Sequence, residues 1–418
     1  MNDFQYRNGR LYCEAVPLER IAESVGTPFY VYGYGTLKRH FRVFDGAFAG
    51  LPHLTCFAVK SNSNIAIIRL FIEEGGGVDI VSGGELYRAL KAGVDPRKVV
   101  YSGVGKKAEE IEYALQTGIL MFNVESAQEL EAISACAKRM GKRAGVALRI
   151  NPDVDAETHP HISTGLKENK FGIDIEKSLE AYRHARTLEN IEVIGVSCHI
   201  GSQVTKTAPF VDALKRLKKL LGRLEAEGFD IRYLDLGGGL GITYKDETPP
   251  EPAEYAEALL AFARELPCTL VFEPGRVLVG NAGALVTKVL YRKNTEEKDF
   301  VIVDAGMNDL IRPSLYDSYH RILPVAEKKK DEIIADVVGP ICESGDYLAK
   351  KRKLPEINQG ELIAVMSAGA YGFSMSSNYN SRPRVAEVLV KDDRFYVIRE
   401  RETYEDLVRG ERIPEFHI

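Results

Sequence analysis

Short β-rich runs alternate with amphipathic helical segments between residues 50 and 275, and this alternation constrains the fold more than any other feature. The eight strand-like runs are TCFAVK (55–60), VDIV (78–81), KVVYSG (98–103), LMFNV (120–124), VALRI (146–150), IGVSCHI (194–200), RYLDLG (232–237) and TLVFE (269–273). Eight strand–helix units in one stretch favour a closed parallel barrel, because open sheets commonly have fewer strands. We therefore expect a (β/α)8 TIM barrel.

The segments between these runs have the spacing of helices that cover a core. In PFVDALKRLKKLLGRLEAEG, the apolar side chains recur every three or four residues, with Lys and Arg between them. They are Phe210, Leu214, Leu217, Leu221 and Leu224. This spacing places one apolar face against the barrel and one charged face in water.

The pattern changes after residue 280. Runs such as ALVTKVLYRK, DFVIVDAG, ELIAVMSAGAYG and RVAEVLVKDDRFYVIRE are strand-like and are separated by turn signals. They predict a mostly antiparallel β-sandwich or β-barrel domain. The first 30 or so residues also look like strands, and we expect them to join that domain. The predicted domains are the barrel, 36–280, and the β domain, 1–35 with 281–418.

Composition excludes several classes of function. A chain of 418 residues is long for one domain, and this length agrees with the two predicted domains. The net charge of −5 gives no electrostatic reason to expect nucleic acid or an anionic membrane as a partner. No apolar stretch approaches the roughly 20 residues that cross a bilayer.

The six cysteines are far apart and form no CxxC pair, which suits neither a disulfide framework nor a zinc site. Five lie in or beside apolar segments and are expected to be buried thiols, whereas Cys342 stands apart from them. The amino terminus is polar and lacks the apolar core of a secretory signal. We expect a cytoplasmic protein.

Polar residues at the strand ends form a candidate site, because barrel enzymes build their active sites there. Lys60 ends the first run and points toward the barrel mouth, where it could form a Schiff base with a carbonyl cofactor. An ordinary strand-end lysine is the commoner case for a single residue. Asp79 follows in the second run and could orient catalytic groups, although strand-end aspartates often cap a helix instead.

Arg149 ends the fifth run and His199 the sixth. An imidazole at that place can lie flat against an aromatic ring such as a pyridine. A lone histidine is more often a core or capping residue. Ser202 follows closely, with a hydroxyl that can donate to a phosphate oxygen.

The loops after the last two runs carry the stronger signal. Gly237, Gly238 and Gly239 follow a strand directly, and such a run lets backbone N–H groups converge on a phosphate. A structural turn is the alternative. Glu273 could pair with a protonated pyridine nitrogen, and Arg276 could bind a phosphate or carboxylate in a bidentate manner. Together the strand-end residues describe a cofactor with an aldehyde, a phosphate and a pyridine nitrogen.

Six motifs in order, AVKSN, HIGSQ, DLGGG, EPGR, GPICESGD and SAGAYG, resemble the barrel-type pyridoxal-phosphate decarboxylases. That family includes enzymes acting on diaminopimelate, ornithine and arginine, and the resemblance covers nearly the whole chain. The resemblance is strongest to the branch that decarboxylates meso-2,6-diaminopimelate to L-lysine and CO2, the last step of lysine biosynthesis. It implies pyridoxal 5'-phosphate as the cofactor.

The resemblance also implies roles for individual residues. Lys60 would bind the cofactor covalently, His199 would stack on its ring, and Glu273 would face its nitrogen. The residues matching phosphate-binding positions are Ser202, Gly238, Gly239 and Arg276, and Gly275 matches a further cofactor-binding position. Asp79 and Arg149 match supporting positions. Tyr371 would lie near phosphate and substrate.

Cys342 matches a proton donor that reaches the neighbouring subunit's site, which implies a two-fold homodimer with shared active sites. Arg276, Arg312, Tyr316, Glu343 and Tyr371 match substrate-binding positions. A cationic partner such as Arg312 suits the distal carboxylate of diaminopimelate and would repel the bare ammonium of ornithine. An ornithine- or arginine-type decarboxylase and a catalytically silent relative are the alternatives.

Overall fold

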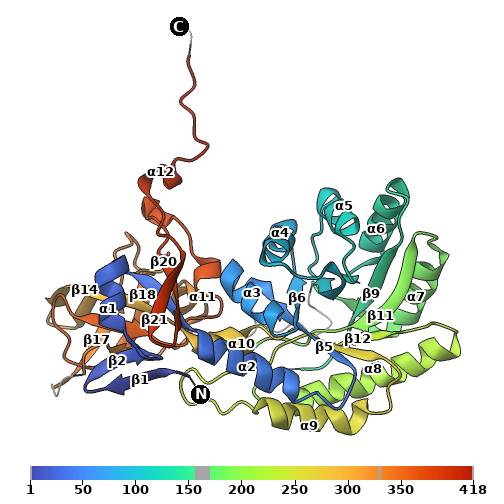
Figure 1. The fold of residues 1–418 in the computed structure, drawn as a ribbon, viewed down its shortest axis with the longest axis horizontal. Helices are drawn as coiled ribbons and strands as arrows, with labels where there is room; N and C mark the ends of the chain where they lie inside the picture. The colour runs from blue at the N-terminus through green and yellow to red at the C-terminus, as the bar shows by residue number, and fades with distance from the viewer. Residues whose placement is uncertain (1, 156–169, 328–330, 417–418) are drawn as a thin grey trace. The chain divides into compact units, whose positions relative to one another are not determined.

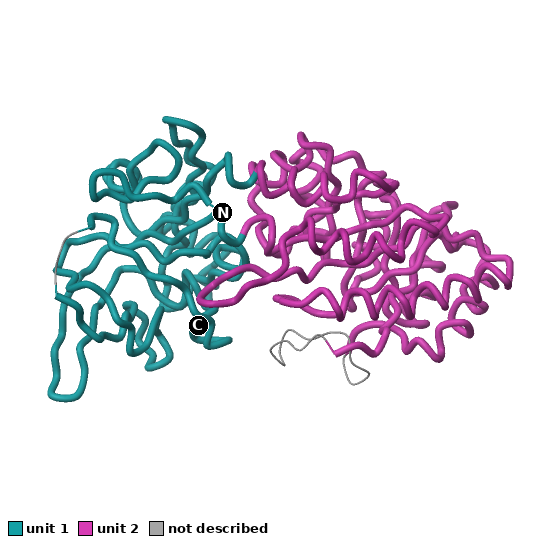
Figure 2. Tube along the Cα trace, turned by 90° about the horizontal axis from the view of Figure 1, so that it is seen from below, with its two compact units in different colours: residues 1–37, 280–418 teal, residues 38–279 magenta. Residues whose placement is uncertain are grey.

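The structure, a computed structural model, describes residues 2–155, 170–327 and 331–416. The chain divides into two compact units, one formed by residues 1–37 and 280–418 and the other by residues 38–279 (Figure 2). Each unit is described by itself. Across the described ranges, every helix is too short or too polar to serve as a membrane span.

The unit of residues 38–279 is a closed barrel of eight parallel strands within the described part of the chain. In chain order they are β5 (His53–Ala58), β6 (Gly77–Ile80), β7 (Val99–Tyr101), β8 (Met121–Val124), β9 (Ala144–Asn151), β11 (Ile191–Ser197), β12 (Tyr233–Asp235) and β13 (Thr269–Phe272). β13 pairs with β5, and this pairing closes the ring. The short β10 (Ile173–Asp174) extends the sheet beside β9. All eight predicted strands and the predicted barrel are confirmed.

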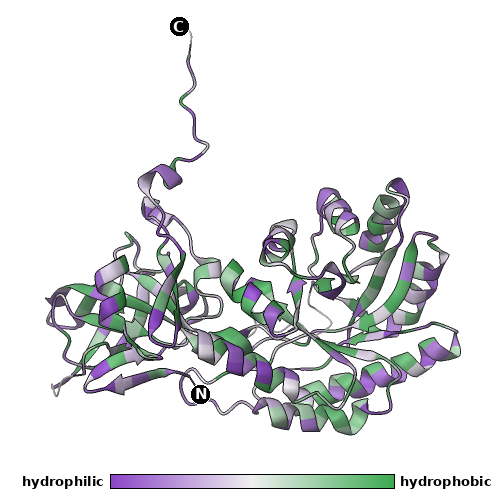
Figure 3. Cartoon of the chain, in the orientation of Figure 1, coloured by the Kyte–Doolittle hydropathy of each residue, from purple (hydrophilic) through white to green (hydrophobic). Residues whose placement is uncertain are grey.

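Helices cover the outside of the barrel (Figure 1). They are α2 (Tyr34–Gly46), α3 (Ile65–Glu73), α4 (Gly83–Ala92), α5 (Ala108–Thr117), α6 (Ala127–Arg139), α7 (Ser178–Thr187), α8 (Ala208–Ala226) and α9 (Pro252–Ala263). The short α10 (Arg276–Val279) follows β13. The predicted apolar face of α8 is buried throughout. Figure 3 shows the consequence, with apolar barrel strands and helices of mixed polarity around them.

Two of these helices begin with the same cap. Ser82 and Ser126 each accept a hydrogen bond from the backbone N–H three residues later, at Glu85 and Glu129. Each glutamate side chain in turn accepts a hydrogen bond from a backbone N–H just before its helix. The donor is Val81 before α4 and Glu125 before α6. Serine followed by glutamate at this spacing satisfies N–H groups that the first turn leaves without partners. These caps fix the loops that follow β6 and β8.

The other unit contains a nine-stranded, mostly antiparallel sheet among the described residues. Its strands are β4 (Phe29–Gly33), β14 (Gly283–Asn294), β15 (Asp299–Val303), β16 (Ile322–Pro324), β17 (Glu332–Val338), β18 (Tyr347–Pro355), β19 (Leu362–Val365), β20 (Ala386–Lys391) and β21 (Arg394–Arg399). β4 lies between β14 and β20, so the amino-terminal segment joins this sheet as predicted.

Smaller elements complete this unit. A separate three-stranded antiparallel sheet contains β1 (Phe4–Arg7), β2 (Arg10–Cys13) and β3 (Val16–Pro17). The helices are α1 (Leu18–Val25), α11 (Arg312–Tyr316) and α12 (Tyr404–Leu407). The core of the unit joins β4, β14 and β20 through apolar side chains such as Val31, Val286 and Val388.

Candidate active site

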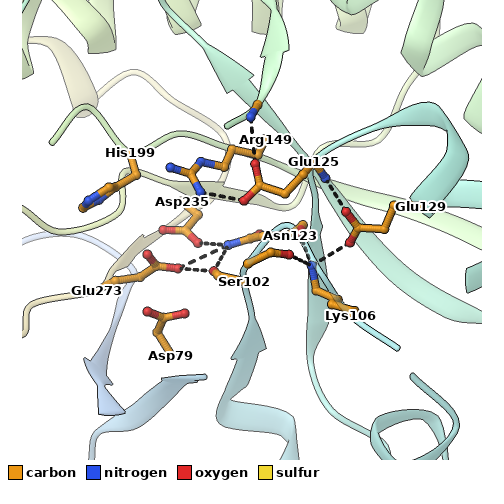
Figure 4. Close-up of polar contacts among 12 residues, drawn as sticks. Asp79, Ser102, Lys106, Asn123, Glu125, Glu129, Arg149, His199, Asp235 and Glu273 are labelled. Carbon is orange, nitrogen blue, oxygen red and sulfur yellow. Dashed lines mark hydrogen bonds and ion pairs between the residues drawn. The ribbon is translucent and has the colours of Figure 1, made fainter. Parts of the chain in front are cut away.

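Polar side chains converge on a cavity of about 330 Å³ at the carboxyl ends of the barrel strands (Figure 4). The polar residues lining it include Lys60, Ser102, Asn123, Arg149, Ser197, His199 and Glu273. The hydroxyl of Ser197 is buried and has no hydrogen-bond partner among the described residues. A polar ligand in this cavity would therefore find donors and acceptors ready for it.

Lys60 lies in a short 3-10 turn directly after β5. Its Nζ is hydrogen-bonded to Oδ2 of Asp79, which is fully buried within β6. The other carboxylate oxygen of Asp79 is also buried and lacks a partner among the described residues. Asp79 therefore holds the lysine amine at the cavity wall, and it does not cap a helix.

His199 lies two residues beyond β11 and is neutral. The backbone N–H of Gly238 donates to its Nδ1 at 3.1 Å, so the neutral ring carries its proton on Nε2. Burial, and then the positive charges of Arg149 and Lys60, hold the pKa of His199 well below its usual range. A neutral imidazole can stack on an aromatic ring without adding charge to it.

Glu273, directly after β13, belongs to a buried polar cluster. Ser102 donates to its Oε1 at 3.1 Å, and the Asn123 amide reaches the same oxygen at 3.2 Å. Asn123 also donates to Oδ2 of Asp235 at 2.7 Å. Burial, followed by the charges of Asp235 and Asp79, raises the pKa of Glu273 well above its usual range.

Arg276 begins α10 and is buried among candidate phosphate-binding residues. Its guanidinium donates to Oγ of Ser202 at 3.0 Å and to the hydroxyl of Tyr244 at 2.6 Å.

The loop after β12 is packed so closely that side chains are excluded. A Cβ at Gly238 would lie 2.2 Å from the carbonyl oxygen of Glu273, and one at Gly239 would lie 2.3 Å from a neighbouring carbonyl oxygen. These glycines are required by packing, whatever ligand they contact.

Arg149 reaches the cavity from β9 and belongs to a chain of buried charges that the sequence did not reveal. Its guanidinium donates to Glu125 at 2.6 Å. The second oxygen of Glu125 accepts the backbone N–H of Gly172 at 2.7 Å. Beside this pair, Lys106 donates to Glu129 at 2.6 Å, and the Lys106 side chain is fully buried. The four charges form two ion pairs in the barrel wall (Figure 4).

Replacing Lys106 with Met is expected to lower the free energy of unfolding by about 3–5 kcal/mol, because a buried carboxylate would lose its cation. Burial already lowers the pKa of Lys106 and raises that of Glu129, so only the pairing keeps both charged. Urea unfolding checks this value. The double variant Lys106→Met/Glu129→Gln removes both charges and should recover part of the loss. A single variant within 1 kcal/mol of wild type would contradict this account.

The remaining predicted residues belong to the unit of residues 1–37 and 280–418. Arg312 begins α11 and is buried, and its guanidinium donates to Oγ of Ser318 at 3.2 Å. Tyr316 ends the same helix. Tyr371 follows β19 with a positive φ of 55°, an uncommon conformation for a tyrosine.

Cys342 is exposed, whereas the other five cysteines are buried, as the sequence predicted. Its backbone N–H donates to Oδ1 of Asn380 at 2.8 Å. The next residue, Glu343, accepts a hydrogen bond from the hydroxyl of Tyr379 at 2.8 Å. The segment after Tyr371 thus holds the loop that presents the thiol and the carboxylate.

Ser102, Asn123 and Asp235 were not among the predicted site residues, although each lies in or directly after a predicted strand. A polar residue in or directly after a predicted strand is the signal that indicated Lys60, and the same signal is present at these three residues. Lys106, Glu125 and Glu129 carry no comparable signal, because charged residues are ordinary in loops and at helix starts.

The barrel matches the family model described as "Pyridoxal-dependent decarboxylase, pyridoxal binding domain" over residues 34–280. The chain therefore belongs to the pyridoxal-dependent decarboxylases, whose cofactor is pyridoxal phosphate. The residues present fit that group. The cavity offers the Lys60 amine for an aldehyde and the buried Glu273 carboxyl for a ring nitrogen.

Within that family, the chain is a member of the diaminopimelate decarboxylases. It is 54% identical to the diaminopimelate decarboxylase of Haemophilus influenzae over 97% of this chain and 98% of that protein. The structure of the Helicobacter pylori enzyme complexed with L-lysine is similar, with 45% identity, a TM-score of 0.91, and coverage of 94% of this chain and 98% of that one. The enzyme from M. jannaschii in complex with L-lysine has a TM-score of 0.94 at 39% identity, with 99% of each chain covered.

Proposed function

We propose that this protein removes CO2 from meso-2,6-diaminopimelate to give L-lysine, with pyridoxal phosphate as its cofactor. The observation that carries the proposal is the single cavity that contains both the Lys60 amine and the buried Glu273 carboxyl. The relationship to diaminopimelate decarboxylases across the full chain supports the choice of substrate.

The barrel residues would bind the cofactor. Lys60 would hold it through its aldehyde, Glu273 would hold its ring nitrogen, and neutral His199 would hold its ring. The residues proposed to hold the phosphate are Ser202, Gly238, Gly239, Gly275 and Arg276. When bound, pyridoxal phosphate would supply an electron sink, because its protonated ring can accept the electron pair left on carbon by the loss of CO2.

Other residues would manage the substrate and its protons. Lys60 would supply the amine that exchanges with the substrate's α-amine, and Asp79 would keep that lysine amine in place. Cys342 donates its thiol proton to the substrate carbon that lost CO2. Arg149 would support the ring from the cavity wall.

The two ends of the substrate need different partners. Arg312 offers a cation to the distal carboxylate, and Glu343 offers a carboxylate to the distal ammonium. Arg276, Tyr316 and Tyr371 would complete the binding site.

We further propose a cytoplasmic homodimer in which Cys342 of one protomer acts in its partner's site. An exposed thiol remains reduced in the cytoplasm, as a proton donor must. Mixing Lys60→Ala and Cys342→Ala subunits tests the shared site. Random pairing should restore about a quarter of the wild-type activity, because half of the dimers then contain one intact site of two. No recovery in dimers shown to be mixed would contradict the sharing.

Growth provides a test of the function itself. A bacterium that lacks its own diaminopimelate decarboxylase requires lysine. Expression of this protein should remove that requirement, whereas the Lys60→Ala variant at equal abundance should not. Continued dependence on lysine with abundant folded protein would contradict the proposal.

A further inference from the structure

Two buried carboxyl groups lie against each other beside the cavity. Asp235 is fully buried, Glu273 is 7% exposed, and the amide of Asn123 donates to both, to Oδ2 of Asp235 at 2.7 Å and to Oε1 of Glu273 at 3.2 Å. Burying one ionised carboxylate is costly and burying two side by side is costlier, so a proton on one of them is favoured. Like charges at such a distance also favour one shared proton over two ionised groups.

The donors around the pair show which group carries that proton. Both oxygens of Asp235 accept N–H groups, Oδ2 from Asn123 at 2.7 Å and Oδ1 from the backbone of Gly237 at 2.9 Å. Glu273 is different, because Ser102 and Asn123 both approach its Oε1. Its Oε2 accepts no hydrogen bond from them. Asp235 is thus better stabilised as the ion, which leaves Oε2 of Glu273 as the oxygen to carry the proton; Figure 4 shows the Ser102 and Asn123 donors.

The charged groups facing the pair agree with this assignment. Asp79 is a third carboxylate nearby and favours the protonated form of Glu273, while the Lys60 amine opposes it. Burial and the charge of Asp79 also raise the pKa of Asp235, to about 6.

The other titratable groups beside the pair add no charge. Burial raises the pKa of the Cys56 and Cys198 thiols, so both remain protonated. His199 is neutral as described. Among the described residues that line the cavity, the cation besides Lys60 is Arg149, and its guanidinium is paired with Glu125.

We propose that Asp235 and Glu273 hold one proton between them before the cofactor binds, and that Glu273 delivers this proton to the pyridine nitrogen. The O–H bond of Glu273 breaks as an N–H bond forms on the ring, so a carboxylate then faces a cation and no proton crosses the cavity mouth. Asn123 is the positioning residue, because its amide contacts both carboxyl groups. The inference rests on the proposed placement of the ring nitrogen at Glu273.

Infrared difference spectroscopy tests the proposal without reference to turnover. Cofactor-free protein in mildly alkaline buffer should show the C=O band of a protonated carboxyl group, and adding pyridoxal phosphate should remove it. Alkaline buffer keeps Glu85 and Asp309 ionised, since burial raises the pKa of each to about 7. The Glu273→Gln variant should lack the band that the cofactor removes. Cofactor binding that leaves every protonated-carboxyl band in place would overturn the proposal.

Asn123→Ala tests the positioning role. Oε1 is the carbonyl oxygen of protonated Glu273, so losing a donor to it should raise the frequency of the band that the cofactor removes. Asn308→Ala is the matched control, because Asn308 is also buried and donates to a buried carboxyl, that of Asp309. An unchanged frequency in Asn123→Ala would exclude this role for Asn123. Absorbance of the bound cofactor measures cofactor binding independently of the infrared band. Failure to produce lysine would contradict the proposed function and would leave the proton-transfer proposal to the infrared result.

Discussion

Replacing Lys60 with Ala is expected to lower kcat by at least about 10³-fold, since the substitution removes the amine proposed to bind the cofactor covalently. The amine lies on a rigid strand end and is held by Asp79. Both features position it for bond formation. Steady-state lysine production, with pyridoxal phosphate in excess, measures the effect.

Lys60→Arg is the matched variant for this experiment. Arginine keeps a cation beside Asp79, so the fold and the buried carboxylate are preserved, but it cannot take over the covalent role. Both variants should be equally inactive, and Lys60→Arg should also retain the wild-type unfolding midpoint. Wild-type turnover by either one would show that Lys60 is not the nucleophile.

Replacing Arg312 with Ala should raise the KM for diaminopimelate by at least about 30-fold with a smaller change in kcat. Truncating one partner of a buried charge pair costs about 2–5 kcal/mol. The distal carboxylate does not take part in bond breaking, so the loss falls mainly on binding. Initial rates across substrate concentration separate the two constants.

Arg312→Lys keeps the charge but loses the planar donor pair, and an intermediate KM is expected. Arg394→Ala, on the exposed side of β21, serves as the control for removing an arginine. Arg312 also contacts Ser318, so the unfolding midpoint of each variant must be compared. A stable Arg312→Ala variant with unchanged KM would remove this residue from the substrate site.

The barrel was predictable because its signal is local. Each strand is a short apolar run, and each helix has its own periodicity, so the sequence alone places Lys60 and Glu273 at strand ends. The β unit was predictable in type but not in strand order. β4 inserts between β14 and β20, which lie more than 250 and 350 residues further along the chain, and no local pattern encodes such pairing.

The buried charges of the site were the least predictable part. Glu129 three residues after Ser126 indicates a helix cap, and the structure contains that cap. The same carboxylate also pairs with Lys106, which depends on how the loop after β7 folds back. Asn123 lies within an apolar strand, where its side chain could face either the barrel interior or the helices. Only the three-dimensional arrangement joins it to Asp235 and Glu273.

Product analysis with three substrates tests the central proposal most directly. The purified protein with pyridoxal phosphate would be given meso-diaminopimelate, L-ornithine and L-arginine separately, and CO2 and amine products would be followed. The account predicts L-lysine and CO2 in equal amounts from diaminopimelate and no turnover of the other two. Turnover of ornithine or arginine instead would contradict the choice of diaminopimelate as the substrate that Arg312 binds. No turnover of any of the three by cofactor-loaded protein would contradict the proposal that the protein is a decarboxylase.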